Sequence, residues 1–348
     1  MSVVIVTGSS GLVGSESVNF FCNKGFDVVG LDNNLREFFF GKDGSTKSVK
    51  SFLLKKNKNF QSCNIDIRNY NSLEKIFKKY KKKISLIIHC AAQPSHDYGK
   101  NYPIIDFDVN AKGTLNLLEL TKIYSSDARF IFMSTNKVYG DNPNDLKLIE
   151  KKKRWELKKN HPYYKGIDEK FSIDNCTHSF FGVSKSYADL IVQEYGKNIG
   201  LNTVSFRGGC ITGPNHRGAK LHGFLSYLVK ITLKKKAYTI IGYKGKQVRD
   251  NIHSSDLVNC FWEFYKKPRK GEVYNIGGGR FSNCSILEAL DLIERSKNIT
   301  IKKFFLKTPR VGDHVWYITN LKKFKSHYPR WIQKNNTKKI IEELIENN

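Results

Sequence analysis

Residues 3–14 read VVIVTGSSGLVG, and this stretch decides the fold. The four β-branched residues at its start predict a short buried parallel strand. The glycines that follow fall at positions 8, 11 and 14. Gly8 allows a tight turn from strand to helix, Gly11 lets a pyrophosphate approach the backbone, and Gly14 lets the next helix pack against the sheet. We therefore expect a strand, a phosphate-binding turn and a helix in succession.

A second apolar run, VVGL at 28–31, follows this helix and ends in Asp32. The helix between the two strands is expected to bury Val18, Phe20 and Phe21 and to stop at Lys24. An acidic residue about twenty positions beyond the glycines accepts hydrogen bonds from a ribose 2′-hydroxyl and repels a 2′-phosphate. The order of strand, glycine turn, helix, strand and acid predicts a dinucleotide site and favours NAD over NADP; a glycine-rich turn without a ligand is the alternative.

Length and composition fit a large α/β protein. The chain has 348 residues, of which 40% are hydrophobic, so one large α/β domain with an appended lobe can bury a full core. No apolar stretch approaches the roughly 20 residues of a membrane-spanning helix. Residues 1–6 run directly into the glycine turn, which argues against a signal peptide. None of the seven cysteines forms a CxxC pair, so we expect no zinc site or disulfide framework, but reduced thiols and a cytoplasmic location.

The charge of the chain is strongly positive, with a formal net charge of +27. Lysines cluster at 55–58, 78–83, 151–153 and 234–236. No nucleic-acid-binding motif accompanies them, so we expect a solvated basic surface that also favours anionic substrates. Non-specific contact with nucleic acid or an anionic membrane is the alternative.

Strands and helices continue to alternate along the chain. Further strands are expected at 59–63, 84–89, 129–133 and 201–207, and helices at 69–80, 103–124 and 184–198. A long polar loop spans 141–178, and the chain is expected to return to the sheet near 249–253 and 273–277. This pattern predicts an α/β fold with a Rossmann-like, doubly wound parallel sheet and a smaller C-terminal substrate-binding lobe. We place the dinucleotide domain at 1–211, completed by roughly 245–277, and the lobe at 212–244 and 278–348.

Four features carry more than one interpretation. Asp66, just past a strand end, would meet the adenine amino group or cap the helix at 69–80. His89 is expected to be a packed or hydrogen-bonded structural residue, with a catalytic role as the alternative. The aromatic cluster at 38–40 would cover the adenosine, lie at an interface or, as we favour, pack in the core. Asn110 is unfavourable within a helix unless its side chain bonds to neighbouring backbone.

Several blocks together resemble the extended short-chain dehydrogenase/reductase family of nucleotide-sugar enzymes. The resemblance covers nearly the whole chain and rests on TGSSGLVG at 7–14, Asp32, Asp66, HCAAQ at 89–93, STNKVYG at 134–140, Lys185, Arg207 and GKQVRDNIH at 245–253. The STNKVYGD and GKQVRD segments are most similar to the CDP-paratose 2-epimerase (CDP-tyvelose epimerase) subgroup. The resemblance implies an epimerase of surface polysaccharide synthesis that oxidises a sugar hydroxyl with tightly held NAD and returns the hydride to the opposite face. It also implies a homodimer formed through the helices around 103–124 and 184–198.

The resemblance assigns roles to individual residues. It implies NAD contacts by Gly8, Ser10, Gly11, Leu12, Val13, Gly14, Asp32, Asn33, Asp66, Ile67, Ala91, Ala92, Gln93, Asn110 and Lys185. Substrate contacts are implied for His178, Arg207, His222, Arg249 and Arg310, and no metal is implied. A planar guanidinium binds two phosphate oxygens at once, which suits Arg249 and Arg310 to a pyrophosphate, and Asp250 would hold the Arg249 fork.

Three further residues are implied at the reacting sugar. Thr135 would hydrogen-bond the substrate and Asn136 would orient its hydroxyls. Lys137 would neutralise an enolate or alkoxide, with a plain surface lysine as the alternative. The related 4,6-dehydratases carry an Asp-Glu pair after the threonine, so Asn136 and Lys137 argue against that reaction.

The chain departs from the family at its catalytic YxxxK motif, because the matching residues are Phe181-Gly-Val-Ser-Lys185. A phenol with an ordinary pKa of about 10 is activated by a neighbouring ammonium and takes the substrate proton. Phenylalanine has no proton to exchange, and such acid–base catalysis contributes about 10²–10⁴-fold.

Three interpretations remain open. First, another group supplies the base, and the candidates are Thr135, Lys137, His178, Tyr163, Tyr164 or a water that relays the proton to Lys185. Second, the protein is an NAD-dependent nucleotide-sugar reductase or dehydrogenase. Third, it binds NAD and a nucleotide-sugar without turnover.

Overall fold

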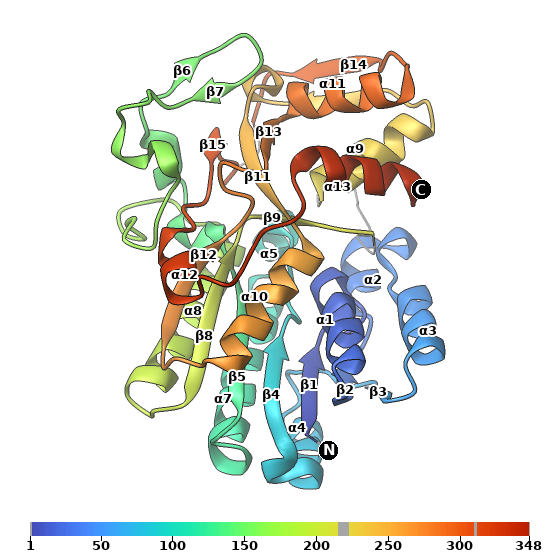
Figure 1. Cartoon of the computed structure of the whole chain (residues 1–348), viewed down its shortest axis with the longest axis vertical. Coiled ribbons are helices and arrows are strands. Elements are labelled where there is room, and N and C mark those ends of the chain that lie inside the picture. The colour runs from blue at the N-terminus through green and yellow to red at the C-terminus, as the bar shows by residue number, and fades with distance from the viewer. Residues whose placement is uncertain (1, 215–222, 310–311, 348) are drawn as a thin grey trace. The chain divides into compact units, whose positions relative to one another are not determined.

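The computed structural model describes residues 2–214, 223–309 and 312–347, which form two compact units (Figure 1). Unit 1 comprises residues 1–135, 180–207 and 258–274, and unit 2 comprises residues 136–179, 208–257 and 275–348. The expected domain boundaries differ from this division at four places. Four segments that we had expected in the dinucleotide domain belong to unit 2, namely 136–179, 208–211, 245–257 and 275–277.

Unit 1 is built on a seven-stranded sheet with the order β12-β8-β5-β4-β1-β2-β3. Its strands are β1 (Val3–Thr7), β2 (Asp27–Leu31), β3 (Phe60–Cys63), β4 (Ile84–His89), β5 (Arg129–Thr135), β8 (Asn202–Gly208) and β12 (Glu272–Ile276). The pairs that join β1 to β2 and β4, β2 to β3, and β4 to β5 are parallel. The strand order reverses between β1 and β4, and in such sheets a ligand binds at the carboxyl ends of the strands at this point.

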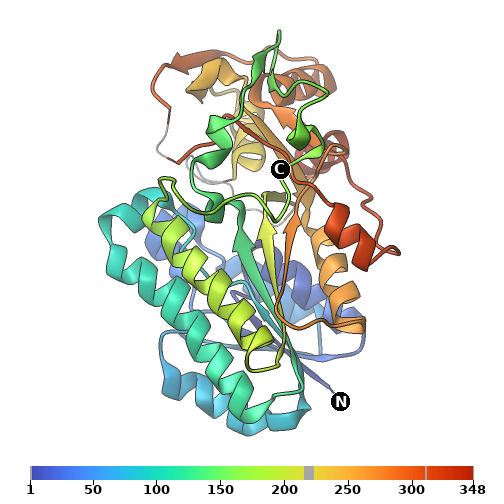
Figure 2. The ribbon, with the colours of Figure 1, turned by 90° about the vertical axis from the view of Figure 1, so that its left-hand side faces the viewer.

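Helices cover both faces of this sheet. One face carries α1 (Leu12–Asn23), α3 (Lys47–Lys56) and α10 (Ser254–Lys266), with Phe20 and Phe21 of α1 in ring contact with Trp262 of α10 (Figure 1). The other carries α4 (Tyr70–Tyr80), α7 (Gly113–Tyr124) and α8 (Phe180–Lys197), and Figure 2 shows α7 and α8 side by side. Val18 and Phe21 are buried as expected, whereas Phe20 is half-buried. The predicted Rossmann-like α/β fold is confirmed.

The prediction of one continuous helix at 103–124 is wrong. The segment instead contains α6 (Pro103–Phe107), a π-helical turn (Asp108–Lys112) and α7, preceded by a short helix α5 (His96–Asn101). The π turn contains Asn110, whose side chain hydrogen-bonds to the backbone of Gln93. Insertions of this kind occur frequently at functional sites, because they redirect side chains within a helix.

The aromatic cluster at 38–40 does not pack in the core. It lies on α2 (Leu35–Phe40), where Phe38 is 64% exposed. The rings of Phe38 and Phe39 contact Tyr98 of α5, with centroids 5.9 and 4.6 Å apart. A sequence pattern cannot separate such a surface cluster from a core one, because both are runs of large apolar residues.

The described residues of unit 2 form three smaller sheets. Its central strand β11 (Val248–His253) pairs with β13 (Asn283–Ser285), β15 (Trp316–Tyr317) and β9 (Cys210–Thr212). The expectation that 249–253 returns to the seven-stranded sheet is therefore wrong, while 273–277 does return to it, as β12. Two further pairs are β10 (Tyr238–Ile241) with β14 (Lys303–Leu306) and the hairpin β6 (Ile149–Glu150) with β7 (Trp155–Glu156).

The helices of unit 2 pack against these sheets. They are α9 (Phe224–Leu233), α11 (Ile286–Lys297), α12 (Lys322–His327) and α13 (Thr337–Glu346). α9, α11 and α13 share one apolar cluster with β10, and a second cluster around Trp316 includes part of the 136–179 segment. The predicted polar loop at 141–178 is thus an integral part of unit 2.

Candidate functional site

The glycine turn has the geometry that the sequence predicts for a phosphate-binding turn. Gly8 has φ +65°, and a Cβ there would lie 2.8 Å from the Ala91 nitrogen. A Cβ on Gly14 would lie 2.0 Å from the Gly8 oxygen. Gly11 is different, because a Cβ would meet only the Gly8 oxygen, at 3.3 Å. Gly8 and Gly14 are therefore required by packing, whereas Gly11 leaves space beside the turn that a pyrophosphate can occupy.

Asp32 is fixed beside this turn. Its carboxylate accepts hydrogen bonds from the Ser10 backbone N–H at 2.9 Å and from the Asn34 backbone N–H at 2.8 Å. Ser10 lies in the glycine turn. The predicted cofactor residues Leu12 and Val13 are the first two residues of α1. The turn and the acid thus meet at the carboxyl ends of β1 and β2, and these residues fit the pyrophosphate and adenosine ribose of NAD.

Asp66 lies next to Asp32 in the same arrangement. The Asn33 side chain donates to Asp66 at 3.1 Å, and Arg68 forms an ion pair with Asp66. Burial opposes ionisation, but the hydrogen bonds from Arg68 and Asn33 outweigh it and hold the pKa of Asp66 below its usual range. Asp66 does not cap α4, because Asn69 does so by accepting from the Ser72 N–H.

The carboxyl end of β4 forms a rigid wall of this site. His89 is buried, bonds to Thr7 at 2.7 Å and to Thr114 at 2.9 Å, and burial lowers its pKa. Thr7 Oγ1 also accepts from the backbone N–H groups of Cys90 and Ala91. The structural role predicted for His89 is confirmed. Ala91 and its neighbour Ala92 are half-buried, whereas the side chain of Ile67 lies in the core.

A buried polar network links α5, α6 and α8. Asn110 bonds to Gln93 through both backbone groups, at 2.9 and 3.1 Å, and donates to Ser184 at 3.1 Å. Asp106 accepts from Gln93 and Ser184, and burial raises the pKa of Asp106. Gln93 and Asn110 were predicted from the sequence, but Asp106 and Ser184 were missed. The available signal was positional, since Asp106 precedes Asn110 by one helical turn and Ser184 precedes Lys185 directly.

Lys185 and Phe181 lie one turn apart on α8. The Lys185 ammonium is buried, donates to the Met133 carbonyl at 2.6 Å and lies 4.0 Å from the Phe132 ring centroid. Burial lowers the pKa of Lys185 to about 7. Phe181 is 7% exposed, and its ring contacts that of His96, a residue the sequence did not single out. Thr135 ends β5 in the same unit.

Arg249, a predicted substrate residue of unit 2, forms an ion pair within the unit. Arg249 pairs with Asp313 and not with Asp250, so the expected Asp250 partnership is wrong. Asp250 is buried and accepts from the backbone of Gly279 and Thr319, at 2.8 and 3.0 Å. Burial raises the pKa of Asp250.

The other predicted residues of unit 2 are buried or bond to nearby backbone. Lys137 donates to the Gly312 carbonyl at 2.8 Å, Asn136 is buried, and His178 donates through Nε2 to the Val138 carbonyl at 2.8 Å. The predicted substrate residues His222 and Arg310 lie outside the described residues.

Arg207 does not match the prediction of a substrate ligand. Its guanidinium is 5% exposed and pairs with Asp189 of α8 at 2.8 Å; Asp189 is itself 1% exposed. This buried ion pair joins β8 to α8. The Asp189 carboxylate takes guanidinium N–H groups of Arg207 that a phosphate would otherwise bind.

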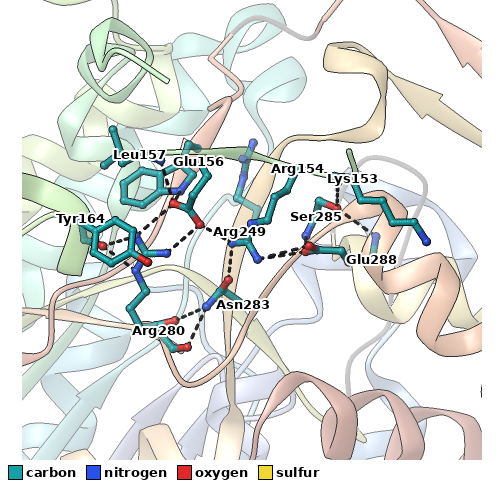
Figure 3. Close-up of polar contacts among 12 residues, drawn as sticks. Lys153, Arg154, Glu156, Leu157, Tyr164, Arg249, Arg280, Asn283, Ser285 and Glu288 are labelled. Carbon is teal, nitrogen blue, oxygen red and sulfur yellow. Dashed lines mark hydrogen bonds and ion pairs between the residues drawn. The ribbon is translucent and has the colours of Figure 1, made fainter. Parts of the chain in front are cut away.

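The 136–179 segment is held in unit 2 by an ion-pair network (Figure 3). Arg280 pairs with Glu156, and its guanidinium lies 4.0 Å from the Tyr164 ring centroid and also bonds to the Tyr164 carbonyl. Arg154 pairs with Glu156 and Glu288. Burial opposes ionisation of Glu156, but Arg280 outweighs it and holds the pKa of Glu156 below its usual range. Tyr164 therefore serves this network, which argues against it as the missing base.

The described residues contain no group of side chains able to hold a metal ion and no helix able to cross a membrane. All seven cysteines lie in the described part of the chain and are free thiols.

Comparisons with known proteins agree with this geometry. The model of the NAD dependent epimerase/dehydratase family matches residues 4–277, and the chain belongs to this family. CDP-paratose 2-epimerase of Salmonella typhi is 31% identical over 353 residues, covering 99% of this chain and 98% of the relative.

Two crystal structures share the fold. They are dTDP-glucose 4,6-dehydratase from Bacillus anthracis in complex with NAD, with a TM-score of 0.78 at 23% identity, and UDP-glucose 4-epimerase from Thermus thermophilus in complex with NAD, with a TM-score of 0.78 at 22% identity. The match to the dehydratase covers 100% of this chain and 96% of the dehydratase chain. The match to the epimerase covers 99% of this chain and 98% of the epimerase chain.

Proposed function

We propose that the protein is an NAD-dependent nucleotide-sugar epimerase of the CDP-paratose 2-epimerase kind, acting in surface polysaccharide synthesis. The observation that carries the proposal is the open face of Gly11 beside the fixed carboxylate of Asp32. The family membership and the whole-length similarity to CDP-paratose 2-epimerase support the sugar chemistry.

NAD is the cofactor in this proposal. When bound, it takes a hydride from the sugar carbon and later gives it back. The backbone around Gly11 binds the pyrophosphate, and Asp32 accepts from the adenosine ribose hydroxyls. Lys185 lies on the helix that the Asp106 network fixes, and the family resemblance assigns it to the nicotinamide ribose.

The substrate is a nucleotide-sugar, with a CDP-sugar favoured by the resemblance. Arg249 would bind its pyrophosphate, and Asp313 would hold the guanidinium in place for two parallel hydrogen bonds. Lys137 would stabilise negative charge on the sugar oxygen, and Thr135 and Asn136 would hydrogen-bond its hydroxyls.

Transient reduction of the nicotinamide tests this function. The purified protein is loaded with NAD, mixed rapidly with CDP-, UDP- or GDP-sugars and followed by near-ultraviolet absorbance. We expect a transient reduced-nicotinamide signal with one sugar and full retention of NAD. Lasting net reduction, with cofactor exchange, would favour a reductase or dehydrogenase. Binding of a sugar with no absorbance change would favour a non-catalytic binding protein.

We also propose a homodimer formed by α6 and α8. Apolar side chains on α8 recur at the 3-4-3 spacing of a helix-packing stripe and are exposed, namely Phe180, Val183, Tyr187 and Leu190. Ile104 and Phe107 of α6 extend the stripe, and α6 contacts α8. A second copy would cover this face, and Val183→Glu should convert a dimer to a monomer in light scattering after gel filtration. A monomeric wild type would rule out the dimer.

A further inference from the structure

His96 and Phe181 form a close pair next to the position of the missing phenol. The ring centroids are 5.1 Å apart and the planes meet at 68°, so the two rings lie edge to face. Phe181 occupies the tyrosine position of the family motif, and a tyrosine hydroxyl would sit one C–O bond beyond this ring. His96 is half-buried, and its imidazole is an ionisable group in direct contact with the Phe181 ring.

We propose that His96 is the proton acceptor and donor that replaces the missing tyrosine. The proposal rests on the epimerase function proposed above. As the sugar is oxidised, its O–H bond breaks and a new N–H bond forms on the imidazole. The O–H electron pair becomes the second C–O bond, while the C–H pair leaves the carbon with the hydride that NAD accepts. The return step reverses each change, so the imidazole gives the proton back and no further oxidant is needed.

The backbone around His96 is fastened to the helix that carries Phe181. His96 is the first residue of α5, and the preceding residue, Ser95, caps this helix by accepting from the Tyr98 N–H. Gln93 donates to the Ser95 carbonyl at 2.8 Å and also to Asp106, which accepts from Ser184 on α8. This chain of bonds holds the backbone next to His96 against the helix of Phe181 and Lys185, and acid–base catalysis requires such preorganisation.

The ordinary acidity of an imidazole suits this role. Its ordinary pKa of about 6.5 lies near neutrality, so it needs no neighbouring cation for activation, unlike a phenol with a pKa of about 10. Among the candidates from the sequence, His178 donates to a backbone carbonyl, and Lys137 does the same. The ring of Tyr163 packs against Phe171, with centroids 5.0 Å apart.

The first test locates the imidazole without requiring turnover. The pKa of His96 is measured by NMR titration of the histidine ring signals, assigned with His96→Asn, in the presence of NAD⁺ and of NADH. A cationic nicotinamide next to the imidazole disfavours its charged form, so we expect the His96 pKa to be lower with NAD⁺ by about half a unit or more. The neighbouring charged groups on α5 and on the helices packed against it are Asp97, Lys100, Asp106 and Lys185. Both titrations use the same protein, so these groups are present in both samples. Equal pKa values in the two complexes would overturn the proposal.

The second test separates the role of His96 from the proposed function. In a wild type that turns over, His96→Asn should lower kcat by about 10²–10⁴-fold with little change in the Kd for NAD, and adding Phe181→Tyr should restore most of the lost rate. His327→Asn, on α12 in unit 2, is the matched control and should retain the wild-type rate. Full activity of His96→Asn in an active wild type would refute the role of His96 and leave the epimerase function standing. A wild type that is inactive with every nucleotide-sugar would refute both.

Discussion

Alanine at Gly11 or at Gly14 should have opposite consequences for NAD binding and stability. A Cβ at position 14 would lie 2.0 Å from the Gly8 oxygen and 2.7 Å from the Gly8 carbonyl carbon, and both contacts are backbone. Neither atom can move without opening the turn that Gly8 forms at φ +65°. At position 11 the added methyl meets one oxygen at 3.3 Å, and the backbone there (φ −75°, ψ 176°) suits alanine.

The magnitudes follow from these distances. Overpacking against backbone costs about 3 kcal/mol. An unfolding entropy of about 2.1 cal/mol/K per residue corresponds to about 1.4 °C of Tm per kcal/mol in a chain of 348 residues, so Gly14→Ala should melt about 4 °C lower. Gly11 is the N-cap of α1, where alanine in place of glycine costs about 1 kcal/mol or less. The methyl of Gly11→Ala fills the space proposed for the pyrophosphate, so the Kd for NAD should rise at least tenfold, about 1.4 kcal/mol.

Thermal melts without ligand and calorimetric titrations with NAD measure the two effects separately. We expect Gly11→Ala to fold like the wild type and bind NAD poorly, and Gly14→Ala to lose stability even without NAD. Wild-type NAD affinity in Gly11→Ala would show that the turn does not hold the pyrophosphate. An unchanged Tm in Gly14→Ala would refute the packing argument itself.

Three further changes test groups outside the turn. Arg207→Met leaves the buried carboxylate of Asp189 unpaired and should lower the free energy of unfolding by about 3–5 kcal/mol in urea; a loss below about 1 kcal/mol would contradict a structural pair. Because burial lowers the pKa of Lys185 to about 7, the unfolded chain holds a proton that the folded chain lacks between pH 7 and its ordinary value. Stability should therefore rise with pH in this window, by up to about 1.4 kcal/mol per unit, and urea unfolding of Lys185→Met should lack this contribution. Arg280→Ala removes the main partner of Glu156, so amide exchange in the β6–β7 hairpin should quicken, and unchanged exchange would show that the pair does not hold the hairpin.

The parts of the fold that the sequence predicts well depend on local signals. The strand at 3–7, the glycine spacing and Asp32 lie within one βαβ unit, where each residue type follows from its own backbone conformation or burial. Gly14 is an example, because the reason for glycine there is an oxygen six residues earlier in the chain. Patterns that depend on residues so close in the chain can be recognised in a single sequence.

The parts that the sequence did not predict depend on distant residues. Ser184 bonds to Asp106, 78 positions earlier, and the bond joins α8 to α6. Arg207 is a substrate contact in the family resemblance, yet its guanidinium forms a buried ion pair with Asp189 of α8. Strand β11 was expected in the seven-stranded sheet but joins a different sheet. In each case a residue's role is set by which element the chain brings next to it, and periodicity carries no information on that choice.

The surroundings of Phe181 argue against a site that has simply lost its chemistry. Lys185 is buried deeply enough for its pKa to fall to about 7, and Asp106 is buried enough for its pKa to rise. Both groups destabilise the fold relative to apolar side chains of similar size, because an amine and a carboxyl are removed from water. A protein that only needed a packed core beneath this helix would gain stability from replacing them. Ionisable groups that oppose folding in this way are typical of catalytic sites. The ring that stands at the tyrosine position therefore lies on the same helix as a buried amine and contacts the imidazole of His96, which is the arrangement that the proposed proton transfer requires.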